Sequence, residues 1–151
     1  MQTITEILTV ARSLEGTPYD WGGTSSRTGF DCSGYVWYCY AYSGRYFPRE
    51  QYLACNFSEN GGGRFTRIYG DYTTWESGDI LLFRQVRHMG IWQSGPNPGM
   101  WHARGSRNPI NRTVQFAPYG EQYWNWIIRA NHGMPEVWRY VGFIYPPVYF
   151  R

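Results

Sequence analysis

The sequence lacks the features that would place the chain in a membrane, in a secretion pathway or on nucleic acid. It has no run of about 18 apolar residues, the length that spans a bilayer. Its first residues have neither the basic segment nor the continuous apolar stretch of a secretion signal. The 14 basic residues are all arginine, they are scattered, and the net charge is only +3. We therefore expect no signal peptide, no membrane insertion and no nucleic-acid binding.

Cysteine is also scarce. The three cysteines form no even set for disulfides, and the three histidines complete no zinc spacing with them. These residues are Cys32, Cys39, Cys55, His88, His102 and His132. We expect neither disulfides nor a metal site.

Composition favours a folded chain. Charged residues make up 17% and apolar residues 42%, which excludes the disordered class. At 151 residues the chain has the size of one ordinary domain, so we expect a single domain over residues 1–151. Aromatic residues reach 20%, more than we expect one small core to hold. Some rings are therefore predicted at the surface, where Tyr and Trp serve binding or assembly; half-exposed rims without a function are the alternative.

Two helices are predicted in the first third of the chain. Thr3 and Glu6 have the spacing of a capping box, and apolar residues follow at helical spacing until Gly16. Residues 17–29 are rich in Gly, Pro and hydroxyl residues and predict an irregular loop. Asp31 can then cap a second helix over residues 32–43.

Cys32 would be the first residue of that second helix. The unpaired N–H groups of a helix start stabilise a thiolate and lower its pKa, which favours a nucleophile. Gly34 would leave the first turn open to a substrate carbonyl. Cys39, two turns deeper, is predicted to be buried, and a buried structural role stays open for Cys32 as well.

Strands are predicted in the second half. Residues 45–75 predict only a short helix over 48–57 and a break at 60–63, whereas residues 80–83, 88–94 and 100–104 read as strands. A symmetric loop would place Ser94 opposite Met100, with His88 and His102 on one sheet face. In that register the two histidines are four positions apart, roughly 13 Å, and touch only if a bulge or twist brings them together. A thiolate beside an oriented imidazole is the arrangement with which cysteine attacks an acyl carbon.

Six motifs, in order, resemble the NlpC/p60 family of papain-like bacterial cell-wall peptidases. They read GTPYDWGG (16–23), GFDCSG (29–34), FPRE (47–50), SGDILLFR (77–84), HMGIW (88–92) and MWHA (100–103). The resemblance implies a papain-like α+β fold, in which N-terminal helices carrying the nucleophile pack on a mainly antiparallel sheet. It fades after residue 104, where residues 120–140 look like an aromatic insertion before a last strand at about 140–145.

The resemblance also assigns roles to site residues. Cys32 would be the nucleophile, His88 the base that takes the thiol proton, and His102 the residue that orients His88. His132 matches nothing in the family and is predicted to be a loop residue. No cofactor is implied.

A substrate subsite is implied as well. Tyr19, Asp31 and Ser33 would receive the free amino end of a stem peptide, with Asp31 as charge partner of the ammonium and Tyr19 near the oxyanion. Asp31 could instead simply cap the helix, and both roles can hold together.

The implied reaction is hydrolysis of an amide bond in peptidoglycan stem peptides, between γ-D-glutamate and the diamino acid, through a thioester. As a short stand-alone domain, the chain looks most like the wall peptidases attached to phage tails. This resemblance implies a virion location and action in the bacterial envelope. It also implies tail or baseplate partners at the aromatic surface. Other amides or acyl transfer are alternatives, for example in an effector exported from the cytoplasm. A non-catalytic plug in a tail or envelope complex is the alternative of another class.

Overall fold

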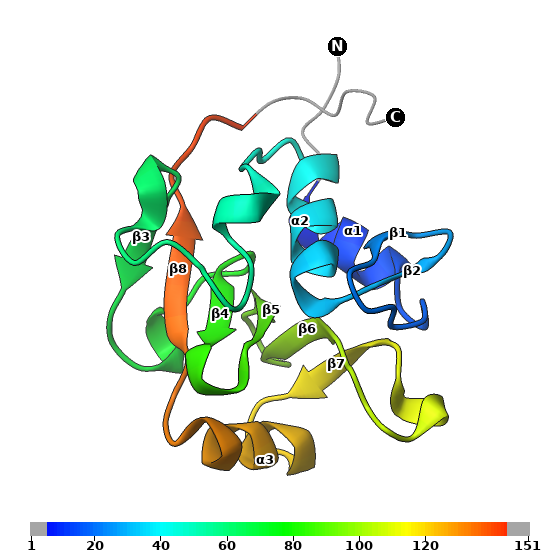
Figure 1. Cartoon of the computed structure of the whole chain (residues 1–151). Coiled ribbons are helices and arrows are strands. Elements are labelled where there is room, and N and C mark those ends of the chain that lie inside the picture. The colour runs from blue at the N-terminus through cyan, green and yellow to red at the C-terminus, as the bar shows by residue number, and fades with distance from the viewer. Residues whose placement is uncertain (1–5, 145–151) are drawn as a thin grey trace.

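The computed structural model of the chain describes residues 6–144, and a six-stranded antiparallel sheet runs through it in the order β3-β8-β4-β5-β6-β7 (Figure 1). The strands are β3 (Phe65–Ile68), β4 (Ile80–Phe83), β5 (His88–Gln93), β6 (Gly99–Ala103), β7 (Val114–Pro118) and β8 (Glu136–Tyr140). A separate two-stranded ribbon, β1 (Thr24–Ser25) and β2 (Gly29–Phe30), precedes the second helix. Short 3-10 turns occupy Arg49–Gln51, Gly61–Gly63, Tyr72–Thr74, Arg84–Val86 and Pro109–Asn111.

Helices cover both faces of the sheet. The N-terminal helices α1 (Ile7–Ser13) and α2 (Cys32–Tyr42) pack on one face. Helix α3 (Gln122–Asn131) packs on the other face, below the sheet in the view of Figure 1. The predicted α+β architecture, with N-terminal helices on an antiparallel sheet, is confirmed.

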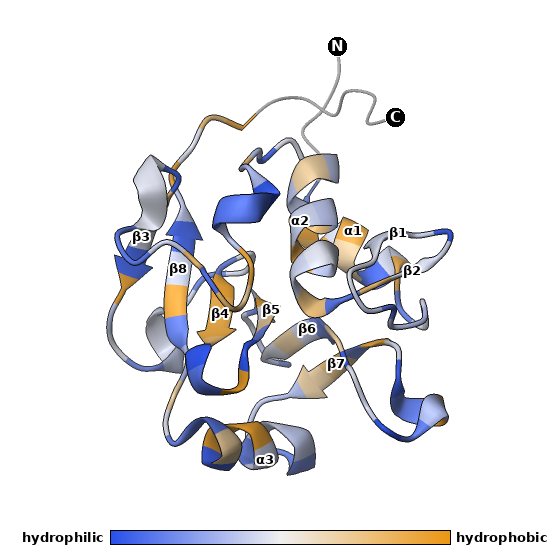
Figure 2. Ribbon diagram, in the orientation of Figure 1, coloured by the Kyte–Doolittle hydropathy of each residue, from blue (hydrophilic) through white to orange (hydrophobic). Residues whose placement is uncertain are grey.

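Strand β4 shows why its sequence is apolar without interruption. Ile80 and Leu82 face the core under α1 and α2, whereas Leu81 and Phe83 face the core under α3. All four side chains are fully buried, and β4 is orange along its length in Figure 2. A strand that is buried on both faces loses the alternation of polar and apolar residues, as the prediction of a buried strand assumed.

The two cores explain the aromatic content. The larger core holds rings from α2, β3, β6 and β8, and the smaller core holds Trp75, Trp92 and Trp124. Within residues 6–144 the rings that are mostly exposed are those of Trp21, Tyr69, Trp126 and Phe143. The expectation that one core could not hold the rings was right, but a second buried face takes up most of the excess.

The predicted elements match the structure unevenly. The second helix is confirmed as α2, and the first helix starts at Ile7 with Glu6 at its N-cap but without a side-chain cap. Thr3, the other half of the predicted capping box, lies outside the described residues. Ribbon β1–β2 and strand β3 were not predicted.

The aromatic segment at residues 120–140 is an integral part of the fold and is not an insertion before a last strand. It forms α3 and β8, and β8 lies between β3 and β4. The strand predicted at about 140–145 was therefore wrong in place. The strand begins at Glu136, earlier than the pattern indicated, and its next two residues, Val137 and Trp138, are buried on opposite faces of the sheet.

Arg139 ties β8 to the start of β4, and its loss should weaken the fold. Its Nε and one terminal nitrogen donate to the two carboxylate oxygens of Asp79 at 2.9 and 2.8 Å, and Asp79 is only 2% exposed. Arg139→Met leaves a buried carboxylate without its partner, so we expect the free energy of unfolding to fall by about 2 kcal/mol. Urea denaturation followed by Trp fluorescence measures this change.

A matched control is Arg67→Met. Arg67 lies 3.8 Å from Glu136, which keeps its closer pair with Arg84, so we expect a loss below about 1 kcal/mol. Equal losses in the two variants would contradict a special role for the Asp79–Arg139 pair.

Candidate active site

Asp31 fixes the start of α2 to the loop before it. One carboxylate oxygen accepts hydrogen bonds from the Gly34 N–H at 2.6 Å and from the Ser33 hydroxyl at 3.1 Å. The other accepts from the Gly22 N–H at 3.1 Å. The predicted N-cap is therefore confirmed, and this carboxylate also holds the 18–23 segment against the helix.

Gly34 has a different role from the one predicted. A Cβ at Gly34 would overlap the carbonyl oxygen of Gly23, because the loop backbone lies directly against the first turn of α2. The space that was expected to admit a substrate carbonyl is filled by the protein's own backbone. Gly34 is needed for close packing of two backbone segments, and the expectation of an open approach was wrong.

Cys32 lies where α2 meets the start of β5. Its side chain is 8% exposed, and its thiol donates to the carbonyl oxygen of Arg87 at 3.8 Å. Arg87 has a positive φ of 54° and directly precedes His88. Cys32 is therefore placed beside His88 along the chain of β5, although no hydrogen bond joins the thiol to the imidazole within residues 6–144. Cys39 is fully buried, as predicted, and Cys55 is exposed.

The two histidines touch. His88 Nε2 and His102 Nδ1 are 2.8 Å apart, with the rings nearly perpendicular. In the observed register Trp92 lies opposite Met100, so the hairpin loop is residues 94–98 and Gly99 already belongs to β6. This register places the histidines two positions apart instead of four, and neither a bulge nor extra twist is needed. The predicted register was wrong, and the correction brings the pair together.

Burial sets the charges of the site. It raises the pKa of the Cys32 thiol to about 12, and the nearby Asp31 carboxylate adds to this rise. It lowers the pKa of His88 to about 4, helped by the charge of Arg104, and holds the pKa of His102 well below its usual range. Backbone N–H groups of Met89, Ser33 and Cys32 favour the thiolate, as expected of a helix start, but burial outweighs them. The expected lowering of the thiol pKa was wrong for this state, in which thiol and imidazoles are all neutral.

The contact between the histidines limits which nitrogen can act as a base. For Nδ1 of His88 to accept the thiol proton, its Nε2 must carry a hydrogen and donate it to Nδ1 of His102. His102 then carries its own hydrogen on Nε2, which is buried and has no hydrogen-bond partner among residues 6–144. This arrangement allows His102 to orient His88 and to stabilise its protonated form.

The residues predicted for the substrate subsite lie near Cys32 but are partly committed to the fold. Ser33 is buried, and its hydroxyl bonds Asp31. Asp31 also lies 3.6 Å from the guanidinium of Arg49, which occupies the position predicted for the substrate ammonium. The pKa of Tyr19 is raised to about 12, first by burial and then by the charges of Cys32 and Asp31. His132, predicted in a loop, ends α3 in a left-handed conformation.

Two residues of the site were not predicted. The Tyr123 ring of α3 lies 4.6 Å from the ring of His102, and the Arg104 guanidinium lies 4.7 Å over the Tyr123 ring. Burial raises the pKa of Tyr123, the Arg104 charge lowers it, and the Cys32 charge raises it. Arg104 follows His102 by two positions in the strand predicted over residues 100–104, so strand alternation could have indicated it. Nothing in the sequence marked Tyr123.

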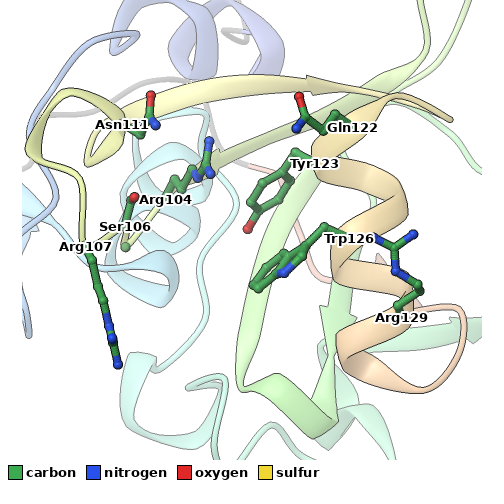
Figure 3. Close-up of a pocket in the computed structure, with 9 residues that line it drawn as sticks. Arg104, Ser106, Arg107, Asn111, Gln122, Tyr123, Trp126 and Arg129 are labelled. Carbon is green, nitrogen blue, oxygen red and sulfur yellow. The ribbon is translucent and has the colours of Figure 1, made fainter.

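Two cavities flank the buried thiol. The larger, about 720 Å³, is lined by Arg104 and by residues of α3 that include Tyr123 (Figure 3). The other, about 580 Å³, is lined by Tyr19, Trp21 and two arginines. Cys32 lines neither cavity, whereas Tyr123 lines the larger one and Tyr19 the smaller one.

Residues 6–144 contain no group of three His, Cys, Asp or Glu side chains that could hold a metal ion. In the same range, no helix has the length and apolar character to cross a bilayer.

A helix-borne cysteine packed against an antiparallel sheet that carries a histidine pair defines a papain-like α+β protein. Residues 16–129, which make up three quarters of the chain, match the NlpC/P60 family. The chain belongs to the NlpC/P60 family.

Similar proteins agree with this assignment. The bifunctional muramidase/DL-endopeptidase CwlT of Bacillus subtilis is 28% identical over 124 residues, which are 78% of this chain and 32% of CwlT. The peptidoglycan hydrolase RipB of Mycobacterium tuberculosis has a TM-score of 0.57 at 26% identity, covering 88% of this chain and 62% of RipB. The NlpC/p60 domain of the peptidoglycan hydrolase SagA has a TM-score of 0.59 at 24% identity, covering 87% and 93%. The chain thus spans about a third of the length of CwlT.

The neutral resting thiol predicts the reactivity of Cys32. In a Cys55→Ser variant, which removes the exposed cysteine, alkylation of Cys32 by iodoacetamide should rise about tenfold per pH unit from pH 6 to 9 without a plateau, because the thiolate fraction grows throughout. Intact-mass spectrometry at timed intervals measures the rate. A plateau from pH 6 upward would show a preformed thiolate–imidazolium pair instead.

Burial is the main cause of the low pKa of His88, and Arg104 should lower this pKa further. Its positive charge disfavours the protonated imidazole, so Arg104→Gln should raise the pKa of His88 from about 4 towards the ordinary value of about 6.5. NMR titration of the imidazole Cε1–H signals in unliganded protein measures this pKa. Arg12→Gln, on the exposed side of α1, is the control and should leave it unchanged. An unchanged His88 pKa in Arg104→Gln would leave burial as the whole cause.

Proposed function

We propose that the protein is a cysteine peptidase that hydrolyses an amide bond in the stem peptides of peptidoglycan. The observation that carries this proposal is the contact of His88 and His102 at 2.8 Å beside the buried thiol of Cys32. Membership of the NlpC/P60 family supports it, as do relatives named DL-endopeptidase and peptidoglycan hydrolase.

The chemistry follows from the positions of these groups. Cys32 attacks the amide carbonyl while Nδ1 of His88 takes the thiol proton, and His102 holds the imidazole through its Nδ1. The backbone N–H groups of Cys32 and Ser33, which lie beside the thiol, would stabilise the developing oxyanion. His88 then passes the proton to the leaving amine, and water, deprotonated by His88, hydrolyses the thioester to release the acid and the free thiol.

Substrate binding has to activate the site. With the thiol pKa at about 12 and the imidazole pKa at about 4, the proton stays on sulfur in the unliganded protein. When a bound substrate changes the environment of Cys32 and Arg104, the thiol pKa and the imidazole pKa come closer together. The resting enzyme is therefore poorly reactive until the cleft is occupied.

Within this function we propose the bond between γ-D-glutamate and the diamino acid as the target. The name DL-endopeptidase of CwlT supports a bond of this class. Asp31 and Tyr19 would receive the free amino end, and Arg49 would have to move from the Asp31 carboxylate, 3.6 Å away, to let an ammonium bind.

Delivery stays a prediction. A phage-tail or virion location, tail partners at an aromatic surface, export as an effector and a non-catalytic plug are neither supported nor contradicted by the site. None of the relatives named above is named as a phage component.

Cys32→Ala tests the proposed function. Wild-type protein should release soluble fragments from purified peptidoglycan, identified by mass spectrometry, and Cys32→Ala should lose at least 1,000-fold in rate because it has no nucleophile. Cys55→Ala is the matched control and should retain full activity, since Cys55 is exposed and has no part in the site. Fragments produced equally by wild type and Cys32→Ala would contradict the cysteine mechanism, and fragments from neither would contradict the substrate.

A further inference from the structure

The larger cavity lies on the α3 side of the catalytic residues. Tyr123 and Trp126 point from α3 towards the 104–107 segment, and Arg104 lies beside the Tyr123 ring (Figure 3). Tyr123 also contacts the ring of His102. Tyr123 therefore lies between this cavity and His102, and the cavity volume of about 720 Å³ is enough for several atoms of peptide beyond the scissile bond.

The lining of this cavity is cationic. Three arginines contribute to it, and no Asp or Glu does; Gln122, Asn111 and Ser106 supply the other polar groups. Within residues 6–144 none of Arg104, Arg107 and Arg129 forms an ion pair with a carboxylate. By contrast, Arg84 and Arg139 pair closely with Glu136 and Asp79. The cavity thus gathers guanidinium groups whose charges the protein itself does not neutralise.

We propose that this cavity is the subsite for a carboxylate-bearing residue on the leaving side of the scissile bond. This inference rests on the proposed function, in which Asp31 and Tyr19 receive the amino end of the stem peptide. The α3 side of Cys32 is then left for the part of the substrate that departs as the amine. Guanidinium groups bind carboxylates through paired N–H donors, and the faces of Tyr123 and Trp126 can pack against an aliphatic side chain.

The same contact would help the chemistry. Arg104 disfavours protonation of both His88 and His102. A substrate carboxylate beside Arg104 offsets that charge, so the imidazole becomes a better base when the correct substrate is bound. Binding and activation are then linked through one side chain.

A pair of peptides tests the proposal. Both carry L-Ala-γ-D-Glu joined to the same diamino acid, with its α-carboxyl free in one peptide and converted to a carboxamide in the other. We expect wild-type kcat/KM to be at least tenfold higher for the free carboxylate. In Arg107→Gln/Arg129→Gln, which keeps Arg104, the preference for the carboxylate peptide should fall at least threefold below that of the wild type. Arg12→Gln, an exposed charge on α1, is the matched control and should keep the full preference.

The outcomes separate the two hypotheses. Equal cleavage of both peptides by wild type, or a preference that is undiminished in the double variant, overturns the carboxylate subsite and leaves the proposed function intact. If neither peptide is cut, calorimetry with Cys32→Ala decides. Tighter binding of the carboxylate peptide supports the subsite while contradicting the proposed cleavage, and absence of binding by both peptides overturns both.

Discussion

The close contact between the backbone of Gly23 and the first turn of α2 at Gly34 is the constraint on which the site depends. It lets the Asp31 N–H bond the Gly23 carbonyl at 3.1 Å while the Asp31 carboxylate holds Gly22. The loop is thereby fixed against the helix, with Tyr19 beside Cys32. A side chain at position 34 would separate the two segments, and with them the helix start from the residues that flank its cysteine.

The second constraint is the lack of charge at the reacting groups. Burial keeps the thiol and both imidazoles neutral, while the charge of Arg104 acts on the imidazoles and that of Asp31 on the thiol. A neutral thiol resists both alkylation and oxidation, because the thiolate is the form that reacts. The arrangement therefore protects the nucleophile before substrate arrives, at the expense of its reactivity at rest. Catalysis and protection depend on the same buried position.

Local patterns in the sequence predicted what is local in the structure. The cap at Asp31, the helix that follows it and the doubly buried strand β4 each depend on neighbouring residues, and the motifs pointed to Cys32, His88 and His102. The register of β5 and β6 was missed because it depends on where the 94–98 loop closes, and a shift of two residues changes whether the histidines meet. The thiol pKa was missed because burial comes from the whole fold. Tyr123 reaches the site from a distant helix, which no local pattern could show.

Strand β8 has a consequence for how the molecule is made. It lies between β3 and β4, and Phe65 pairs with Tyr140, 75 positions later in the chain. All three residues of the cysteine–histidine site have left the ribosome well before the strand that closes the sheet around them. Pairings so distant in sequence form slowly. During synthesis the chain must therefore pass through a stage in which β3 and β4 are present but β8 does not yet pair with them. The site can reach its final form only after β8 has been added to the sheet.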